Sequence, residues 1–361
     1  MPNELRLELE KARAADRRRD EGDGLEAPRS ALDVLSSLNE RIAAGKVDEF
    51  QPIPTGFSPL DKIVGGGLRP GELLLIGGAQ GSGKTTMALQ MARNMAASGQ
   101  ATALYVCFEH DNEYLIQRLI AMESALNALP AKSGAVKIQD VKKEVLQSYV
   151  SAAEAGADAK LGANARLQPA LERIARYGGN LLLMRGTTTS TTVDNLRSMV
   201  IDQGRSQGRR LVLFVDYLQK VPVLPEPADE AEKVTRIVSG LKDIALSQEV
   251  PVVAIVAADR EGLKAKRLRN HHLRGSSAIN YESDIILILN DKYQIVAKVN
   301  IEFNPYQAQR FRDWVIASVE KNRGGQHNVD MEFEKLFEYS CFNPTGRQTA
   351  ESLIEERLFS E

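Results

Sequence analysis

Residues 78–85 read Gly-Ala-Gln-Gly-Ser-Gly-Lys-Thr, a complete match to the pattern G-x-x-x-x-G-K-[ST]. An apolar run at 73–76, Leu-Leu-Leu-Ile, precedes this stretch and predicts a buried strand. A helical pattern follows, with large apolar residues at Met87, Leu89, Met91 and Met95. A glycine-rich turn between a strand and a helix is the context in which this pattern binds phosphates, so we expect an α/β fold.

The glycine positions of such a loop let backbone N–H groups turn toward a polyphosphate, and the helix N-terminus adds its positive end. Lys84 is expected to reach the β- and γ-phosphates, and the Thr85 hydroxyl to bind Mg²⁺. The sequence therefore predicts a nucleoside-triphosphate site. Its residues in the loop and the first helical turn are Gly78, Ala79, Gln80, Gly81, Ser82, Gly83, Lys84, Thr85 and Thr86.

Composition narrows the class of protein. The 361 residues are 43% hydrophobic and 26% charged, which is enough for one large core. A net charge of −2 gives no global attraction to nucleic acid, so any such binding must come from local patches. Cys107 and Cys341 are the only cysteines and form neither a disulfide framework nor a zinc site. No stretch approaches the roughly 18 apolar residues of a membrane span, so we expect no membrane partner and a cytoplasmic location.

Composition also divides the chain into four segments. Residues 1–29 alternate acids and bases and predict a charged arm, either solvated or marginally helical. Residues 30–54 predict a short amphipathic helix, capped by Ser30, and then a polar linker. Residues 55–345 read as an α/β domain, and residues 346–361 as a C-terminal tail.

Six apolar runs in the α/β segment have the length of strands, and most are separated by helical patterns. Such runs imply a mostly parallel, twisted sheet with helices on both faces. The runs are 72–77, 102–108, 180–184, 211–215, 251–256 and 284–290. Alternation at 313–320 and again at 327–333 predicts a C-terminal β-hairpin, whose basic tip reads Lys321-Asn322-Arg323-Gly324-Gly325.

Two carboxylates end predicted strands. Asp216 follows the run 211–215 and can hold the hydration shell of Mg²⁺. Glu109 ends the run that starts at 102, at the edge of the sheet where open α/β folds place their ligands. There it can polarise a water that attacks a γ-phosphate. By residue type alone, Asp216 is more typical of a turn, and Glu109 is more typical of a helix cap or a solvated surface.

A basic segment follows the run 251–256, opposed only by Asp259 and Glu261. Basic side chains in such a loop can bind phosphates without reading bases, and the alternative is a solvated charged loop. No aromatic residues are interleaved, so base stacking is not indicated. The predicted nucleic-acid residues are Arg260, Lys264, Lys266, Arg267, Arg269 and Arg274.

Over about residues 50–345, the order of the motifs resembles that of the motor domain of DnaB-type replicative helicases. Besides the phosphate loop, the runs that carry this resemblance are Thr55-Gly56-Phe57, Gly65-Gly66-Gly67-Leu68, Phe108-Glu109, Val215-Asp216-Tyr217-Leu218-Gln219, Val250-Pro251-Val252-Val253, Leu273-Arg274-Gly275-Ser276 and Glu320-Lys321-Asn322-Arg323-Gly324. Several motifs in a fixed order are far more specific than a phosphate loop alone.

The resemblance implies a RecA-like P-loop core that binds ATP and Mg²⁺ between the subunits of a ring, usually a homo-hexamer, and acts on single-stranded DNA. It implies that Glu109 activates water and that Asp216 serves Mg²⁺. It also implies that Lys321 and Arg323 reach the γ-phosphate of the neighbouring subunit, and that Arg118 lies near the nucleotide. An arginine at a hairpin tip can project across an interface and stabilise transition-state charge.

The helix predicted near 31–44 resembles the family's linker helix, which docks on an adjacent subunit. Two features depart from the family's pattern. Residues 1–50 are too short for the family's helical N-terminal domain, so we expect that domain to be missing. The family's γ-phosphate-sensing glutamine, which follows the strand matching Val250–Ala254, is here Ala257. Because alanine has no polar side-chain atom, we expect hydrolysis but weak coupling to nucleic acid.

The leading prediction is a ring-forming, Mg²⁺-dependent ATPase that acts on single-stranded DNA as a helicase or translocase. A RadA- or KaiC-like RecA-fold ATPase is the alternative enzyme class, although the runs Asp216–Gln219 and Leu273–Ser276 favour the DnaB type. A nucleotide-switched loader or scaffold that binds DNA without unwinding it is the alternative of a different class, and Ala257 is compatible with it.

Overall fold

The computed structural model of the protein describes residues 28–45, 51–155, 165–207, 210–275, 277–296, 309–350 and 353. The chain divides into two compact units, Met1–Phe50 and Gln51–Glu361. The charged arm predicted for residues 1–29 lies outside the described residues except for its last two positions.

The first unit contains the predicted amphipathic helix, α2 (Ala31–Ala43). Ser30 caps it: the Ser30 hydroxyl accepts a 3.1 Å hydrogen bond from the Asp33 N–H, and the Asp33 carboxylate accepts one of 3.2 Å from the Ser30 N–H. This reciprocal pair satisfies two N–H groups that the helix itself leaves free. No residue of α2 is buried, and its apolar stripe is exposed at Leu32, Val34, Leu35, Leu38 and Ile42.

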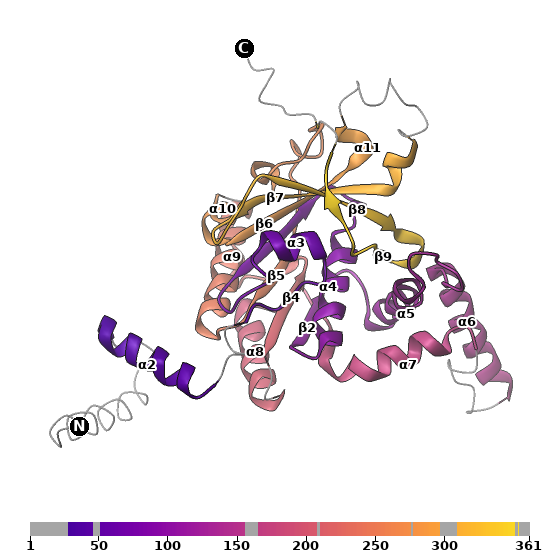
Figure 1. The fold of residues 1–361 in the computed structure, drawn as a ribbon, viewed down its shortest axis with the longest axis horizontal. Helices are drawn as coiled ribbons and strands as arrows, with labels where there is room; N and C mark the ends of the chain where they lie inside the picture. Colours follow the sequence, from indigo (N-terminus) through magenta and orange to yellow (C-terminus); the bar gives the residue numbers. More distant parts are fainter. Residues whose placement is uncertain are drawn as a thin grey trace, which may run out of the picture. The chain divides into compact units, whose positions relative to one another are not determined.

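A ten-stranded sheet organises the second unit, in the spatial order β10-β8-β7-β6-β1-β5-β4-β2-β3, with β9 paired to β8 (Figure 1). The six strands from β6 to β3 are parallel to one another, and β7, β8 and β10 continue the sheet in antiparallel pairs. The strands are β1 (Leu73–Gly78), β2 (Thr102–Cys107), β3 (Leu181–Arg185), β4 (Leu211–Asp216), β5 (Val252–Ala257), β6 (Ile285–Asp291), β7 (Trp314–Asn322), β8 (Val329–Leu336), β9 (Cys341–Phe342) and β10 (Arg347–Gln348).

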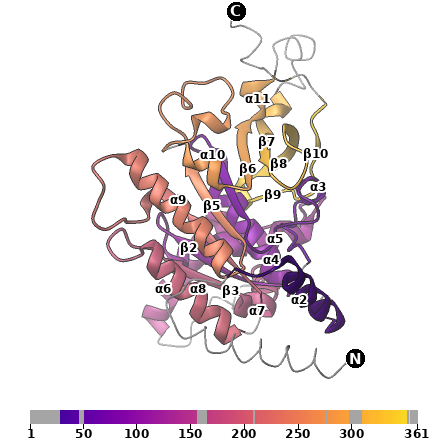
Figure 2. The same cartoon turned by 90° about the vertical axis from the view of Figure 1, so that its left-hand side faces the viewer.

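Helices cover both faces of the parallel part (Figures 1 and 2). On β1, Leu74 and Ile76 belong to the core that includes residues of α4 and α5, whereas Leu73 and Leu75 belong to the core that includes α8 and α9. Burial on both faces explains why these strands read as continuous apolar runs. The helices of this unit are α3 (Ser58–Ile63), α4 (Lys84–Ser98), α5 (Asn112–Ala128), α6 (Ile138–Ala155), α7 (Gln168–Tyr177), α8 (Val193–Gln207), α9 (Glu230–Ser247), α10 (Ala278–Glu282) and α11 (Lys292–Ile295).

The predicted fold class is confirmed: the sheet is mostly parallel, helices flank it, and a C-terminal hairpin, β7–β8, extends it. The six predicted strands lie within one or two residues of β1–β6. The ends of the domain differ from the prediction. Ile53, predicted to lie in the linker, is buried and paired with Leu68, and β10 extends the sheet beyond residue 345. A two-residue strand has no periodicity that a sequence pattern can detect.

Within the described ranges, no helix combines the length and the apolar character needed to cross a lipid bilayer.

Candidate nucleotide-binding site

The glycine-rich loop lies between β1 and α4, at the carboxyl edge of the parallel strands. Gly83, the residue that precedes α4, has a φ of 97°, which side chains rarely adopt. A Cβ atom there would also lie 2.5 Å from the Phe342 ring and 2.7 Å from the Phe337 ring. Because only glycine fits this position, the loop can turn directly into the helix and aim its N–H groups outward.

Lys84 is the first residue of α4, and its side chain folds back over the loop. The ammonium donates hydrogen bonds to the Gly78 carbonyl (2.8 Å) and the Ala79 carbonyl (2.9 Å). Burial lowers the pKa of Lys84, and the negative charges of Asp216 and Glu109 oppose this shift. The ammonium therefore lies at the loop with carboxylates close enough to affect its charge, as a phosphate-binding lysine requires.

Asp216 ends β4 and is 1% exposed. The Tyr105 hydroxyl, from the neighbouring strand β2, donates a 2.9 Å hydrogen bond to its Oδ2 atom. Its Oδ1 atom is buried and accepts no hydrogen bond from any described residue. Burial raises the pKa of Asp216 to about 6, although the hydroxyls of Tyr105 and Thr85, which favour the charged carboxylate, lower it. A buried carboxylate oxygen without a donor is an unusual arrangement that a cation would satisfy.

Glu109 lies beside this aspartate because β2 and β4 are neighbours. Cys107 pairs with Asp216 in the sheet, and the Phe108 N–H donates a 2.7 Å hydrogen bond to the Asp216 carbonyl. The Glu109 side chain is exposed and lines an open cavity of about 630 Å³ together with Lys84, Thr85 and Asp216. The structure thus brings together the loop and both predicted carboxylates in one cavity.

Arg118 lines the same cavity from α5 and is 8% exposed. Its guanidinium donates a 2.5 Å hydrogen bond to the Thr86 hydroxyl, in the first turn of α4. It also lies 6.0 Å from the centre of the Tyr114 ring. Arg118 therefore lies beside the loop, and its proximity to a bound nucleotide stays a prediction.

Ala257 ends β5 and lines the cavity as well. Its N–H donates a 3.3 Å hydrogen bond to the side-chain oxygen of Gln219, and the Gln219 amide nitrogen donates one of 2.9 Å to the Arg274 carbonyl. A glutamine that follows the strand end carrying Asp216 therefore bridges the two ends of the basic loop. The sequence alone suggests no such role for Gln219. Its contacts with Ala257 and Arg274 depend on which strands lie side by side, and the sequence does not give that order.

The hairpin residues lie at the opposite edge of the sheet. Asn322 pairs with Ile285 at the start of β6, and the next residue of β6, Ile286, pairs with Leu75 near the start of β1. Gly78 lies three positions further along β1 than Leu75, so roughly 10 Å of strand lies between this edge and the phosphate loop. Lys321 and Arg323 are not brought to the nucleotide site of their own chain.

Both hairpin side chains have partners within their own chain. The Lys321 ammonium donates to the carbonyls of Asn280 and Ser283, at the end of α10. The Arg323 guanidinium donates to the Tyr281 carbonyl and, over 3.3 Å, to the Asp284 carboxylate. The Arg323 side chain remains 50% exposed.

Two residues of the basic loop are not free to bind nucleic acid, which corrects the prediction for them. Arg267 is 2% exposed and pairs with Asp330 on β8 at 2.6 Å. Arg269 pairs with Glu320 on β7 at 2.7 Å. These two ion pairs fasten the loop to the hairpin. The guanidinium of Arg267 is buried and therefore needs its carboxylate partner.

The other four predicted residues are exposed. Arg260, Lys264 and Lys266 make no ion pair among the described residues, and Arg274 pairs with Glu230 while its side chain is 52% exposed. The loop is closed at its base, since the Asp259 N–H bonds to the His272 carbonyl at 2.9 Å. An open cavity of about 980 Å³ lies between this loop and the start of α9.

A family profile described as "DnaB-like helicase C terminal domain" matches residues 52–342 of this sequence. The chain belongs to this family. The match selects the DnaB type over the RadA- or KaiC-like alternative.

Named relatives of this DnaB-like chain include two replicative DNA helicases. The DnaB helicase of Treponema pallidum is 28% identical over 247 residues, which cover 66% of this chain and 48% of the relative. The DnaB helicase of Haemophilus influenzae is 24% identical over 270 residues, which cover 73% and 52%. The chain thus spans about half the length of the curated relatives it matches.

The fold of the DnaB-like chain also matches solved structures. One of them, an ATPase domain, superposes with a TM-score of 0.66 at 21% identity, covering 88% of this chain and 99% of that one. A DnaB-like replicative helicase, solved in a study of its interactions with primase, gives a TM-score of 0.62 at 21% identity, covering 92% and 71%.

Proposed function

We propose that the protein is a DnaB-like ATPase that works as a ring of identical subunits, usually six, on single-stranded DNA, as a helicase or translocase. One observation carries this proposal. The phosphate loop and its carboxylates lie at one edge of the sheet, and the two basic hairpin residues lie at the other. Each chain therefore offers two halves of an ATPase site that only contact between copies would bring together.

The residues at the carboxyl edge fit Mg²⁺ as well as ATP. The orphaned Oδ1 atom belongs to Asp216, which lines one cavity with Thr85, and oxygen ligands of this kind, supplemented by phosphates and water, suit Mg²⁺. Bound Mg²⁺ would neutralise charge that develops on the transferred phosphate. The described residues contain no group of three or more His, Cys, Asp or Glu side chains arranged to hold a metal.

The chain's own groups would divide the remaining chemistry. Lys84 would exchange the two loop carbonyls for oxygens of the β- and γ-phosphates. Glu109, the exposed carboxylate of the cavity, would accept a proton from the attacking water. Arg323 of one copy would stabilise the charge on the γ-phosphate bound by the next copy.

The basic loop would hold the DNA. Arg260, Lys264 and Lys266 are exposed, and the loop starts at β5, beside the nucleotide cavity. Contacts of this kind are to phosphates, so binding would be insensitive to sequence and sensitive to salt. Arg267 and Arg269 have no part in this proposal because their charges are used within the chain.

Mixed assemblies test the central claim. Glu109→Gln removes the base but leaves the hairpin, and Arg323→Ala removes the finger but leaves the base. Neither variant alone should hydrolyse ATP at an appreciable rate, whereas a mixture contains interfaces in which Glu109 and Arg323 are both intact. We expect ATPase activity to return on mixing, measured alongside the mass of the assembly with an ATP analogue and single-stranded DNA present.

A conservative Arg323→Lys variant serves as the matched control, since lysine keeps the charge but lacks the bidentate geometry. If mixed assemblies form by mass and activity stays at zero, the hairpin does not act between copies. A monomeric mass combined with ATPase activity that is independent of protein concentration would also contradict the proposal.

Ala257 favours a second candidate, a nucleotide-switched scaffold that binds DNA without unwinding it. This position lies in the cavity between the phosphate loop and the basic loop, and its side chain cannot bond to a phosphate. Unwinding of a forked duplex separates the two functions: strand separation in the presence of ATP supports the helicase, and binding without separation supports the scaffold.

A further inference from the structure

The turn that carries Arg323 is exposed, yet one side chain, that of Asn322, makes three hydrogen bonds to the backbone in and beside it. We propose that Asn322 is a positioning residue for Arg323, holding the hairpin tip in the shape that presents the guanidinium to a neighbouring copy. This inference rests on the proposed function, in which Arg323 acts across an interface. It assigns a role to a residue that does not itself touch the nucleotide.

The Asn322 amide spans the turn from inside. Its oxygen accepts a 3.1 Å hydrogen bond from the Gly324 N–H, and its nitrogen donates one of 3.1 Å to the Gln326 carbonyl. A second donor bond, of 3.2 Å, runs from the same nitrogen to the Ile63 carbonyl, at the end of α3. Only an amide has one acceptor and two donor hydrogens at this distance from the backbone, so the three bonds fit asparagine and not aspartate.

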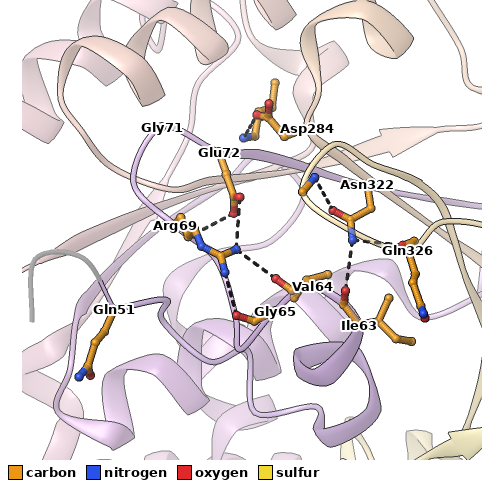
Figure 3. Close-up of polar contacts among 12 residues, drawn as sticks. Gln51, Ile63, Val64, Gly65, Arg69, Gly71, Glu72, Asp284, Asn322 and Gln326 are labelled. Atoms are coloured by element: carbon orange, nitrogen blue, oxygen red, sulfur yellow. Dashed lines mark hydrogen bonds and ion pairs between the residues drawn. The ribbon is translucent and has the colours of Figure 1, made fainter. Parts of the chain in front are cut away.

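Hydrogen bonds also hold the backbone that follows the Ile63 carbonyl, as Figure 3 shows. The Arg69 guanidinium donates to the Val64 carbonyl (3.2 Å) and the Gly65 carbonyl (2.9 Å), which directly follow Ile63. The Glu72 carboxylate in turn accepts a 2.8 Å hydrogen bond from the Arg69 N–H. Because Glu72 precedes β1, this chain of contacts ties the hairpin tip to the strand that leads to the phosphate loop.

Arg323 lies between the residues that the amide fixes. Its N–H donates a 2.9 Å hydrogen bond to the Asp284 carbonyl, which anchors the residue on the side of β6. The Asn322–Gly324 and Asn322–Gln326 bonds fix the other side of the turn. Without them, two glycines, Gly324 and Gly325, would follow an arginine whose backbone is held on one side only. The guanidinium also donates to the Tyr281 carbonyl and the Asp284 carboxylate, so these contacts alone would then have to hold it in place.

The test compares two variants of Asn322 with a control in the same turn. Asn322→Ala removes all three bonds. Asn322→Asp keeps the acceptor for the Gly324 N–H but opposes an oxygen to two carbonyls. Gln326→Ala is the control, because Gln326 contributes its backbone carbonyl and its side chain is not used in the network.

For both Asn322 variants we expect kcat for ATP to fall by about 10- to 100-fold, since displacing a catalytic group by about 1 Å can cost a factor of about 10². Nucleotide affinity, the thermal midpoint and the mass of the assembly should stay at parental values. Gln326→Ala should keep the parental kcat. A parental kcat in Asn322→Ala would overturn the inference, and so would a kcat that falls only in step with the thermal midpoint or the mass.

Mixing adds a readout that a purely structural role would not change. Asn322→Ala copies have an intact Glu109 but a misplaced finger, so mixing them with Glu109→Gln copies should restore activity as Arg323→Ala copies do. If Arg323→Ala copies recover activity on mixing and Asn322→Ala copies do not, the Asn322 defect lies in its own nucleotide site. That result would overturn this inference and leave the proposed function standing. If Arg323→Ala itself keeps the parental kcat, the proposed function fails first.

Discussion

The two edges of the parallel sheet carry the groups that we propose for one reaction, but they hold them in different ways. At the carboxyl edge, Lys84 and Asp216 are fixed by burial, by strand ends and by the start of a long helix. At the amino edge, Arg323 lies on an exposed turn. Hydrogen bonds from the Asn322 side chain stabilise this turn. The carboxyl edge holds its groups around a cavity of the same chain, whereas the amino edge exposes Arg323 to whatever molecule packs against it.

This difference predicts how each edge responds to substitution. In the proposed function, groups at the carboxyl edge contact the nucleotide of their own chain, so their loss should change binding. Groups at the amino edge would meet a nucleotide only after assembly, so their loss should change turnover while binding persists. Variants that affect binding and turnover separately therefore show whether the two edges act as separate half-sites.

The largest expected effect is at Arg323. Arg323→Ala should lower kcat by about 10³- to 10⁵-fold, the range of fingers supplied in trans, and leave the affinity for ATP unchanged. Lys84→Ala should instead abolish tight ATP binding, because it removes the charge that faces the β- and γ-phosphates. Titration with a fluorescent nucleotide measures binding, and steady-state ATP hydrolysis measures turnover. Loss of nucleotide binding in Arg323→Ala would mean that the two edges are not separate half-sites.

The carboxyl edge was largely predictable because its signals are local. The glycine pattern lies directly between its strand and its helix in the sequence, and Asp216 and Glu109 each end an apolar run. Tyr105 was not predictable as the partner of Asp216. Their contact depends on β2 lying beside β4, and no residue pattern states the order of parallel strands.

The basic loop shows what the sequence could not predict. Lys266 and Arg267 are adjacent and have the same charge, yet Lys266 is exposed and Arg267 is buried. What separates them is Asp330, a partner 63 residues further along the chain. Charge patterns predict that a segment is basic, but they do not say which of its cations an acidic side chain from another element will pair with.

An intermediate effect on stability is therefore expected within this loop. Arg267→Ala leaves a cavity and an unpaired Asp330, so it should lower the free energy of unfolding by about 3 kcal/mol. Lys266→Ala, its exposed neighbour, should change it by less than about 0.5 kcal/mol. Chemical denaturation of both variants measures the difference. Equal stability of the two would place Arg267 on the surface after all.

DNA binding should show the reverse order. Lys266→Ala should make the salt dependence of single-strand binding shallower by about 0.7 in the log–log slope, the value for one lost phosphate contact. Arg269→Gln, which keeps a long polar side chain but loses the charge paired with Glu320, should leave the slope unchanged. Fluorescence anisotropy at several salt concentrations provides both slopes. A slope that does not move in Lys266→Ala would make the loop a solvated surface.

A small effect is expected at Ala257, where nucleotide binding and DNA binding would be coupled. A γ-phosphate sensor links ligands because it bonds to one nucleotide state and not to the other, and alanine has no group for such a bond. Single-stranded DNA should therefore change the affinity for nucleotide less than about fivefold, the lower limit of typical coupling, and should stimulate ATP turnover only slightly. The measurement is the hydrolysis rate with and without saturating single strand, and unwinding of a forked duplex should be correspondingly poor.

Two substitutions sharpen this last expectation. Ala257→Gln should increase the stimulation if the cavity accepts the longer side chain, whereas Ala257→Leu adds similar bulk without a hydrogen-bonding group and should not. Gln219 already bonds to the Ala257 N–H and to the Arg274 carbonyl, so its polar side chain spans the strand end and the loop. Strong stimulation in the parent would show that coupling runs through other residues such as Gln219, and it would favour the helicase over the scaffold.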